Sequence, residues 1–161
     1  MTTAQPSLRL RPITAGEYPA LIAASRAGYA HDIEVHGGMP REAAEHKADA
    51  DIAAVLPQGP DTPGHSIYQL ESGAETVGRL WVAEREMDGR RVLYIYEIEV
   101  DEPHRGRGFG RQAMLLAEAE ARARGISTVQ LNVFGGNEVA RGLYRSLGYR
   151  ETAVQMTKDL A

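Results

Sequence analysis

The chain has 161 residues, of which 43% are hydrophobic and 25% charged, values typical of one globular domain that buries a core without staples. The formal net charge of −4 disfavours a general nucleic-acid binder, and no apolar run approaches the roughly 20 residues of a membrane span. The absence of cysteine excludes disulfides, thiolate metal ligands and a cysteine nucleophile. The N-terminus lacks the apolar core of a signal peptide. We therefore expect a single domain over residues 1–161 and a cytoplasmic location.

The first part of the chain predicts one strand and two helices. Residues 8–13 alternate apolar and polar side chains, which indicates a strand. Thr14 and Glu17 have the spacing of a capping box, so a helix is expected to begin there. Residues 31–40 are typical of a loop, and the alanine-rich stretch 40–56 predicts the second helix, with proline near its start.

The rest of the chain predicts three consecutive strands and then an alternation of helix and strand. Asp88-Gly89 is a strong hairpin signal between the second and third of these strands. Gly125 has the position expected just after a helix end. The expected elements are strands 65–72, 76–86 and 90–100, helix 108–124, strand 128–134, helix 137–147 and strand 149–160.

This order, β-α-α-β-β-β-α-β-α-β, favours a fold of the α/β class (α+β with a mixed sheet). The strand after Gly125 should pair in parallel with the strand ending at Val100, because a crossover helix joins them. A central mixed sheet with helices on both faces is the natural arrangement.

The segment HRGRGFG, residues 104–110, joins an expected strand to an expected helix. Glycines allow close backbone approach, and the N–H groups at a helix N-terminus attract anions. Arg105, Arg107 and Arg111 add positive charge, so a phosphate or pyrophosphate is the expected ligand. The segment has no Gly-Lys-Ser/Thr as in a P-loop, and the third glycine of a dinucleotide fingerprint would fall at Arg111. An Arg-x-x-Gly-x-Gly pattern fits, but a basic RNA contact or a plain turn remains open.

Two longer segments carry a family resemblance. YEIEVDEPHRGRGFG resembles the fourth strand and pyrophosphate loop of the GCN5-related N-acetyltransferases, the GNAT family. LNVFGGNEVARGLYRSLGY resembles the fifth strand and following helix, with Asn137 and Tyr144 at the family's spacing. The resemblance covers the whole element order, most specifically residues 94–158, and implies a GNAT-like fold that uses acetyl-CoA.

The resemblance also implies roles for individual residues. Main-chain N–H groups of 105–111 would hold the pyrophosphate, and the main chain of 98–100 would pair with the pantetheine arm like an added strand. This requires the fourth and fifth strands to separate near Glu99 and Asn132. The cofactor-binding residues so implied are Ile98, Glu99, Val100, Arg105, Gly106, Arg107, Gly108, Phe109, Gly110, Arg111, Asn132, Asn137 and Tyr144.

Two of these assignments have structural alternatives. Asn137 is also a good N-cap residue and could mainly fix the start of the helix. Tyr144 could donate a proton to the leaving thiolate, or it could be only a core aromatic.

A general base is expected on the fourth strand. Regular alternation places Leu93, Ile95, Glu97 and Glu99 on one face, with the acidic end near the cofactor arm. Glu97 is the first candidate and Glu99 the second; a solvated or salt-bridged pair is the alternative. Some family members carry a glutamate on the fifth strand where this chain has Asn132, which cannot act as a base.

The resemblance therefore implies an N-acetyltransferase that transfers an acetyl group to a primary amine of a small molecule or peptide. Because the chain has no thiol, direct attack in a ternary complex is the simplest route. The expected partners are acetyl-CoA, an amine acceptor and, as an open alternative, a second copy in a homodimer, with no nucleic acid, membrane or metal. A non-catalytic acyl-CoA sensor on the same fold is the competing function, and an RNA-binding module is a weaker third.

Overall fold

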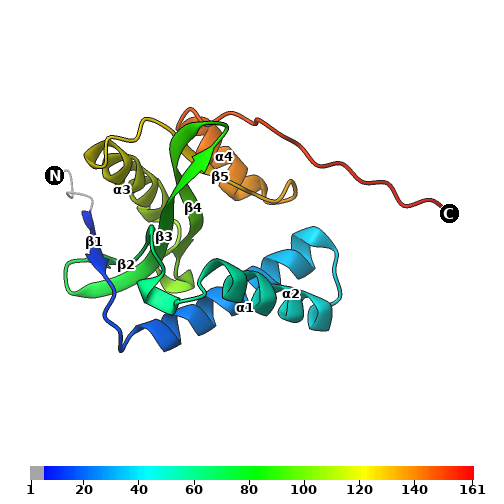
Figure 1. Ribbon diagram of the computed structural model, residues 1–161, viewed down its shortest axis with the longest axis horizontal. Helices are drawn as coiled ribbons and strands as arrows, with labels where there is room; N and C mark the ends of the chain where they lie inside the picture. Colours follow the sequence, from blue (N-terminus) through cyan, green and yellow to red (C-terminus); the bar gives the residue numbers. More distant parts are fainter. Residues whose placement is uncertain (1–5) are drawn as a thin grey trace.

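The computed structural model describes residues 6–161, in which a central sheet has helices packed on both sides (Figure 1). The sequence predicts that the N-terminus is not a signal peptide. Residues 1–5, where that segment begins, lie outside the described residues. The first four strands pair antiparallel and β5 pairs parallel to β4, so the expected mixed sheet is confirmed. The five-stranded sheet has the order β1 (Leu8–Pro12), β2 (His65–Ser72), β3 (Glu75–Met87), β4 (Arg90–Val100) and β5 (Val129–Leu131).

The longest antiparallel pair, β3 with β4, is set by the turn that the sequence predicts. Asp88 and Gly89 have φ angles of 52° and 75°. Positive φ at both central residues is what a two-residue turn needs to match the twist of its strands. The hairpin fixes the register of the strand that carries the expected general base.

The helices form two layers around the sheet. On one side, Leu21 and Ile22 of α1 and Ile52 of α2 pack against Trp81 of the sheet. On the other side, α3 covers β3 and β4, and α4 packs beyond it near β5 (Figure 1). Their bounds are α1 (Tyr18–Gly37), α2 (Arg41–Val55), α3 (Phe109–Ala123) and α4 (Glu138–Ser146), with short 3₁₀ turns η1 (Gly59–Asp61) and η2 (Glu102–His104).

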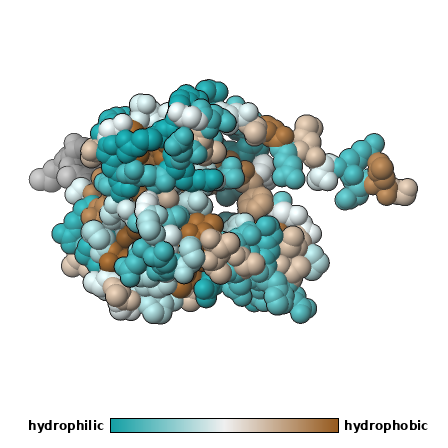
Figure 2. All heavy atoms as spheres, viewed as in Figure 1, coloured by the Kyte–Doolittle hydropathy of each residue, from teal (hydrophilic) through white to brown (hydrophobic). Residues whose placement is uncertain are grey.

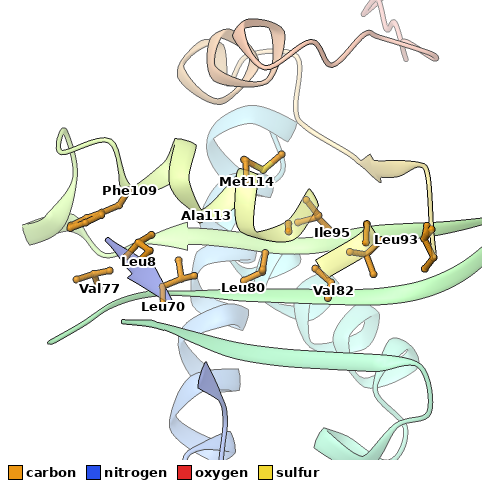
Figure 3. Packing of buried hydrophobic residues seen from close by; sticks show 13 residues of the cluster. Leu8, Leu70, Val77, Leu80, Val82, Leu93, Ile95, Phe109, Ala113 and Met114 are labelled. Atoms are coloured by element: carbon orange, nitrogen blue, oxygen red, sulfur yellow. The ribbon is translucent and has the colours of Figure 1, made fainter. Parts of the chain in front are cut away.

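The main hydrophobic core lies between α3 and the sheet. Its side chains from the helix and from the strands point toward one another (Figure 3). The spacing of the buried helix positions puts them on one face, as an amphipathic helix requires. They are Phe109, Ala113, Met114, Ala117 and Ala121.

The helix α1 continues through residues that the sequence analysis assigned to a loop. Residues 31–37 are helical, and the chain turns only at Gly38, whose φ is 69°. The reason is packing, because Ala30 and Ile33 extend the buried face of α1 against α2. The capping box predicted for Thr14 and Glu17 is present in part. The Thr14 hydroxyl accepts the Glu17 N–H at 3.3 Å, but α1 begins at Tyr18, one residue after Glu17.

The last expected strand is not formed, and this prediction is wrong for the chain as described. Residues 149–160 contain no strand, and the segment after Tyr149 leaves the body of the molecule as an extended tail (Figure 1). The strand expected over 128–134 is also shorter, Val129–Leu131. Both differences follow from pairing, because a strand needs a paired neighbour: the tail has none among residues 6–161, and β5 ends at Leu131, where its pairing with β4 stops.

A β-bulge interrupts β4 and corrects the predicted facing of its side chains. Val82 of β3 pairs with Ile95, whereas Trp81 pairs with Glu97, so Tyr96 is an extra residue without an opposite partner. A bulge changes which face the following residues present and bends the strand.

As a result, the predicted common face of Leu93, Ile95 and the two glutamates is wrong. Leu93 and Ile95 pack in the α3 core, and beyond the bulge it is Ile98 and Val100 that pack against that core. Glu97 instead lies on the α1 side, where it contacts Arg79 beside Ser25 of α1.

Candidate functional site

The paired part of β4 and β5 is short, and the two strands part beyond it. The parallel ladder comprises Leu93 with Val129, Tyr94 with Gln130 and Ile95 with Leu131. Past Ile95, β4 continues to Val100 with no strand on that side among residues 6–161. The bulge at Tyr96 falls where the pairing stops. The separation of the fourth and fifth strands predicted from the sequence is thus present.

The loop after β4 turns the chain sharply into α3. Gly106 and Gly108 have φ angles of 74° and 80°, in the left-handed region that favours glycine. Gly108 occupies the N-cap position of α3. The first N–H groups of a helix have no acceptor within the helix, and they point outward with the positive end of the helix dipole. The geometry is therefore that of an anion-binding loop next to the opening.

The basic side chains of this loop are partly engaged by the protein. The Arg105 guanidinium donates to the Val100 carbonyl at 2.9 Å and to Glu99 at 2.6 Å, which ties the loop to the end of β4. Arg111 donates to the Ser146 hydroxyl at 2.8 Å, and the Arg107 guanidinium lies 5.0 Å from the Phe109 ring centroid.

Two residues that the resemblance assigns to cofactor binding, Phe109 and Gly110, also pack tightly inside the protein. Phe109 is 1% exposed as a whole residue, and its ring packs in the α3 core. A Cβ atom at Gly110 would lie 3.3 Å from Leu143, which makes this glycine a close-packing site between α3 and α4. Both residues therefore stabilise the start of α3 by packing.

Asn137 is the N-cap of α4. Its side-chain oxygen accepts the Ala140 N–H at 3.2 Å. This is the structural alternative left open by the sequence. Asn132 follows the end of β5 and is exposed.

Tyr144 lies on α4 and packs, half-buried, against the α3 core, with its ring centroid 6.1 Å from that of Tyr149. Burial raises the pKa of the Tyr144 hydroxyl, and the negative charges of Glu99 and Asp32 add to the rise. The phenol is therefore protonated at neutral pH and can act as a proton donor. The Tyr144 ring thus packs as the core-aromatic alternative predicts, and its protonated hydroxyl could still donate a proton.

Both candidate bases are in ion pairs. Glu97 contacts Arg79, whose Nε also donates to the Ser25 hydroxyl at 3.2 Å, and the Glu97 side chain is only 18% exposed. Burial raises the pKa of the Glu97 carboxyl, while Arg79 and Ser25 act in the opposite direction. Glu99 pairs with Arg105 and is 36% exposed. The salt-bridged alternative is thus the resting geometry of both glutamates.

An aromatic group lies beside Glu97 on the same side of the sheet. The Tyr96 ring stacks on the Trp81 ring, with centroids 4.8 Å apart. It also contacts the Tyr94 ring edge-on, again with centroids 4.8 Å apart. Trp81 is 5% exposed and donates its indole N–H to His65 Nδ1 at 2.9 Å, so it is a core residue. Tyr94 and Tyr96 additionally have the Arg85 guanidinium over their rings.

The sequence analysis missed the contribution of α1 to this region. His36 stacks on Phe134 with ring centroids 6.2 Å apart, and a Cβ atom at Gly136 would lie 3.2 Å from its Nδ1. The C-terminal part of α1 therefore lies against the loop between β5 and α4. One turn earlier, burial raises the pKa of the Asp32 carboxyl, with His36, His31 and Arg105 opposing. The helical spacing of Ala30 and Ile33 was the available signal, but the following Gly-Gly favoured a loop.

Two further features bear on ligand binding. In the part of the chain that the structure describes, His104 Nδ1 and Gln130 Oε1 are buried without a hydrogen-bond partner, one in the loop before α3 and one on β5. A cavity of about 530 Å³ opens between α1 and α2, lined by both basic and acidic side chains. The surface is hollowed on the side where this helix pair faces α4 (Figure 2).

The fold and the relatives of this chain define a class of protein, the acyltransferases. The Acetyltransferase (GNAT) family matches residues 31–149, well over half of the chain. The chain belongs to the GNAT family and is an acetyltransferase. Its fold is confirmed as the GNAT fold.

Relatives of similar length support this assignment. An uncharacterized N-acetyltransferase of Bacillus subtilis, YycN, is 30% identical over 96% of this chain and 99% of its own. Its crystal structure superposes with a TM-score of 0.90. A second uncharacterized N-acetyltransferase of B. subtilis, YdgE, is 27% identical over 94% of this chain and 97% of its own.

A more distant structure shares the fold alone. It is AAC(6')-Iy in complex with the bisubstrate analog CoA-S-monomethyl-acetylneamine, at 14% identity and a TM-score of 0.59 over 96% of this chain and 98% of its own. Within residues 6–161, no group of three or more His, Cys, Asp or Glu side chains could hold a metal ion. No helix in that range is long and apolar enough to cross a membrane.

Proposed function

We propose that the protein transfers the acetyl group of acetyl-CoA to a primary amine of a small molecule or peptide, by direct attack in a ternary complex. The observation that carries the proposal is the opening between β4 and β5 beside the glycine loop at the start of α3. The free edge of β4 is suited to pair with an extended amide chain, and the helix start is suited to a pyrophosphate. The buried, unpartnered Gln130 and His104 atoms are consistent with a polar ligand in this region.

The chain's own residues supply binding and proton transfer. When bound, acetyl-CoA supplies a thioester carbonyl as the electrophile. The N–H groups of residues 105–111 would fix the pyrophosphate, and residues 98–100 would align the arm. Tyr144 would give its proton to the departing sulfur, because burial keeps its hydroxyl protonated. Without a cysteine, no thiol can carry the acetyl group between donor and acceptor.

Glu97 remains our candidate for the group that takes the proton from the acceptor ammonium. A raised pKa suits a base that works near neutral pH. The ion pair with Arg79 opposes this role, because the Glu97 carboxylate must bind both Arg79 and the incoming amine. Asp32 is a second carboxylate with a raised pKa, and its charge contributes to the raised pKa of Tyr144. Glu99 is the reserve, as it already binds Arg105.

The acceptor class is best tested with a panel of amines. Purified protein is given acetyl-CoA with polyamines, aminoglycosides, amino acids or short peptides, and free CoA is followed with a thiol reagent. The protein has no thiol to react with the reagent, so the background is low. Acetylated product is then identified by mass spectrometry. Amine-dependent CoA release with a matching product supports the proposal.

The competing function, an acyl-CoA sensor, predicts a different result in the same panel. Such a protein would bind acetyl-CoA but release no CoA with any amine. The presence of Tyr144 and Glu97 favours the enzyme. The expected cytoplasmic location and the single domain over residues 1–161 stay predictions.

A further inference from the structure

The C-terminal tail, residues 150–161, has the pattern of a strand without a partner. Every residue of it is exposed. Its large apolar side chains are Val154, Met156 and Leu160, exposed by 68%, 89% and 83%. Even spacing places all three on one face of an extended chain. One-sided apolar alternation is typical of a strand that buries one face on a neighbour.

The sheet ends in two edge strands, β1 and β5, and the edge at β5 is the less covered one. The outer side of β5 has no strand beside it among residues 6–161, and every β5 residue is partly exposed. The adjoining helix α4 has no buried residue, although Leu143 and Leu147 pack partly against the core. At the opposite edge, Gln112 of α3 accepts the Leu8 N–H at 3.0 Å and donates to the Pro6 carbonyl at 3.1 Å. The apolar surface that lacks cover is therefore next to β5.

The tail is directed away from its own β5. Glu151 forms ion pairs with Arg141 and, at 3.1 Å, with Arg145, both on α4. These contacts hold the start of the tail against the helix, and the residues after it project from the body (Figures 1 and 2). A free strand edge and an apolar strand thus occur in one molecule without meeting.

We propose that two copies of this chain exchange their tails, each tail adding as a strand to β5 of the other copy. Residues 152–160 would hydrogen-bond the outer edge of β5, and Val154 and Met156 would cover the apolar side chains of β5 and α4. A two-fold exchange pairs both β5 edges at once, and its closed symmetry limits the assembly to two copies. A second copy is the occupant because the chain itself supplies the strand that its sheet lacks. The inference does not depend on the proposed function.

The first test is the oligomeric state of matched tail variants. Sedimentation velocity of the full chain should show a dimer. Val154→Asp with Met156→Asp charges the apolar face and should raise the dimer dissociation constant about 10²-fold or more, since each buried aliphatic side chain contributes roughly tenfold or more. Gln155→Asp with Thr157→Asp adds the same charge to the other face and should leave the dimer intact. A monomeric full chain, or a dimer equally stable in both double variants, overturns the proposal.

The second test asks whose β5 the tail reaches. Because the natural chain has no cysteine, introduced cysteines are unique. A tagged chain with Ser127→Cys, next to β5, is co-expressed with an untagged chain with Gln155→Cys, and both are treated with a flexible bismaleimide. Exchange predicts a cross-linked heterodimer in a denaturing gel. If the two cysteines placed in one chain give only a monomer with an internal cross-link, the tail returns to its own sheet and the proposal fails.

Discussion

Tyr144 combines a packed ring with a hydroxyl that burial keeps protonated. Tyr144→Phe retains the ring and removes the proton donor, so we expect the maximal rate to fall by about 10²-fold or more. The affinity for acetyl-CoA, measured by titration calorimetry, should change little. Tyr149→Phe is the matched control, since it removes a neighbouring hydroxyl that binds Glu118. Equal rates for the parent and Tyr144→Phe would leave Tyr144 with a packing role only.

If Glu97 is the general base, its titration should appear as a limb in the pH dependence of the rate. Burial raises its pKa above the ordinary value of 4.5, so the active carboxylate should form, and the rate climb, as pH rises through that higher pKa. Glu97→Gln should lose this limb and about 10²-fold in rate. Asp32→Asn and Glu99→Gln, assayed between pH 5 and 9, are the comparisons. A limb that persists in Glu97→Gln and disappears in Asp32→Asn would transfer the role to Asp32.

At single positions the sequence predicts chemistry better than geometry. The glycines and arginines of 104–111 predict an anion loop, and Gly106 and Gly108 have the positive φ that such a turn needs, while anion binding stays a prediction. The ion pairs of Glu97 and Glu99 could not be predicted, since Arg79 lies on another strand. Nor could Asp32, because its place near the site depends on how far α1 extends.

The loop–helix element can be tested through a pair of glycines at the two ends of α3. Gly108 and Gly125 have φ angles of 80° and 70°. A side chain at either costs about 1–2 kcal/mol of stability, because left-handed backbone is strained for other residues. Gly108→Val should also abolish acetyl-CoA binding by blocking approach to the N–H groups, while Gly125→Val should bind normally. Thermal unfolding with and without acetyl-CoA measures both effects. Retained binding in Gly108→Val would rule out this loop as the pyrophosphate site.

The β2–β3 pair carries a histidine that should make stability depend on pH. Burial, with Arg85 nearby, lowers the pKa of His65 below 6.5, and its Nδ1 accepts the Trp81 N–H. The folded state therefore favours the neutral ring. The unfolded chain binds the proton first on acidification, so stability should fall as pH drops below about 6.5.

Denaturant unfolding of His65→Gln tests this dependence. The variant should lose the part of the pH dependence between about 6.5 and 4.5, above the range where ordinary carboxylates titrate. His46→Gln changes an exposed histidine of α2 and should retain it. Identical pH profiles for the parent and His65→Gln would show that this histidine is not responsible.

Elements defined by local signals were predicted well, and so was the parallel pairing of β5 with β4, but the details that depend on strand register were not. The bounds of β2 and β4 and the turn between β3 and β4 agree with the prediction, because alternation and Asp-Gly are local. The bulge at Tyr96 exists only in the register of two strands. The tail has the alternation of a strand but forms none, because no strand among residues 6–161 lies beside it.

For the whole molecule, ligand binding should stabilise the fold. A ligand present at 100 times its dissociation constant adds about 2.7 kcal/mol to the unfolding free energy. Acetyl-CoA and CoA should therefore raise the melting temperature, whereas ATP and NAD should raise it much less. Hydrogen exchange should slow most along residues 96–100, where β4 has no strand on its outer side. Equal stabilisation by NAD would contradict a CoA-specific site.

The extra residue in β4 has a consequence that is a matter of counting. Removing Tyr96 would restore regular alternation while leaving Glu97 and Ile98 on the sides they now occupy, because the bulge absorbs one residue. The same deletion would remove the bend and let β4 run on beside β5. The opening between β4 and β5 thus depends on a single extra residue in β4. A lineage that lost this one codon would keep the core under α3, lose a ring from the Trp81 cluster and, we expect, close the opening that we propose for the cofactor.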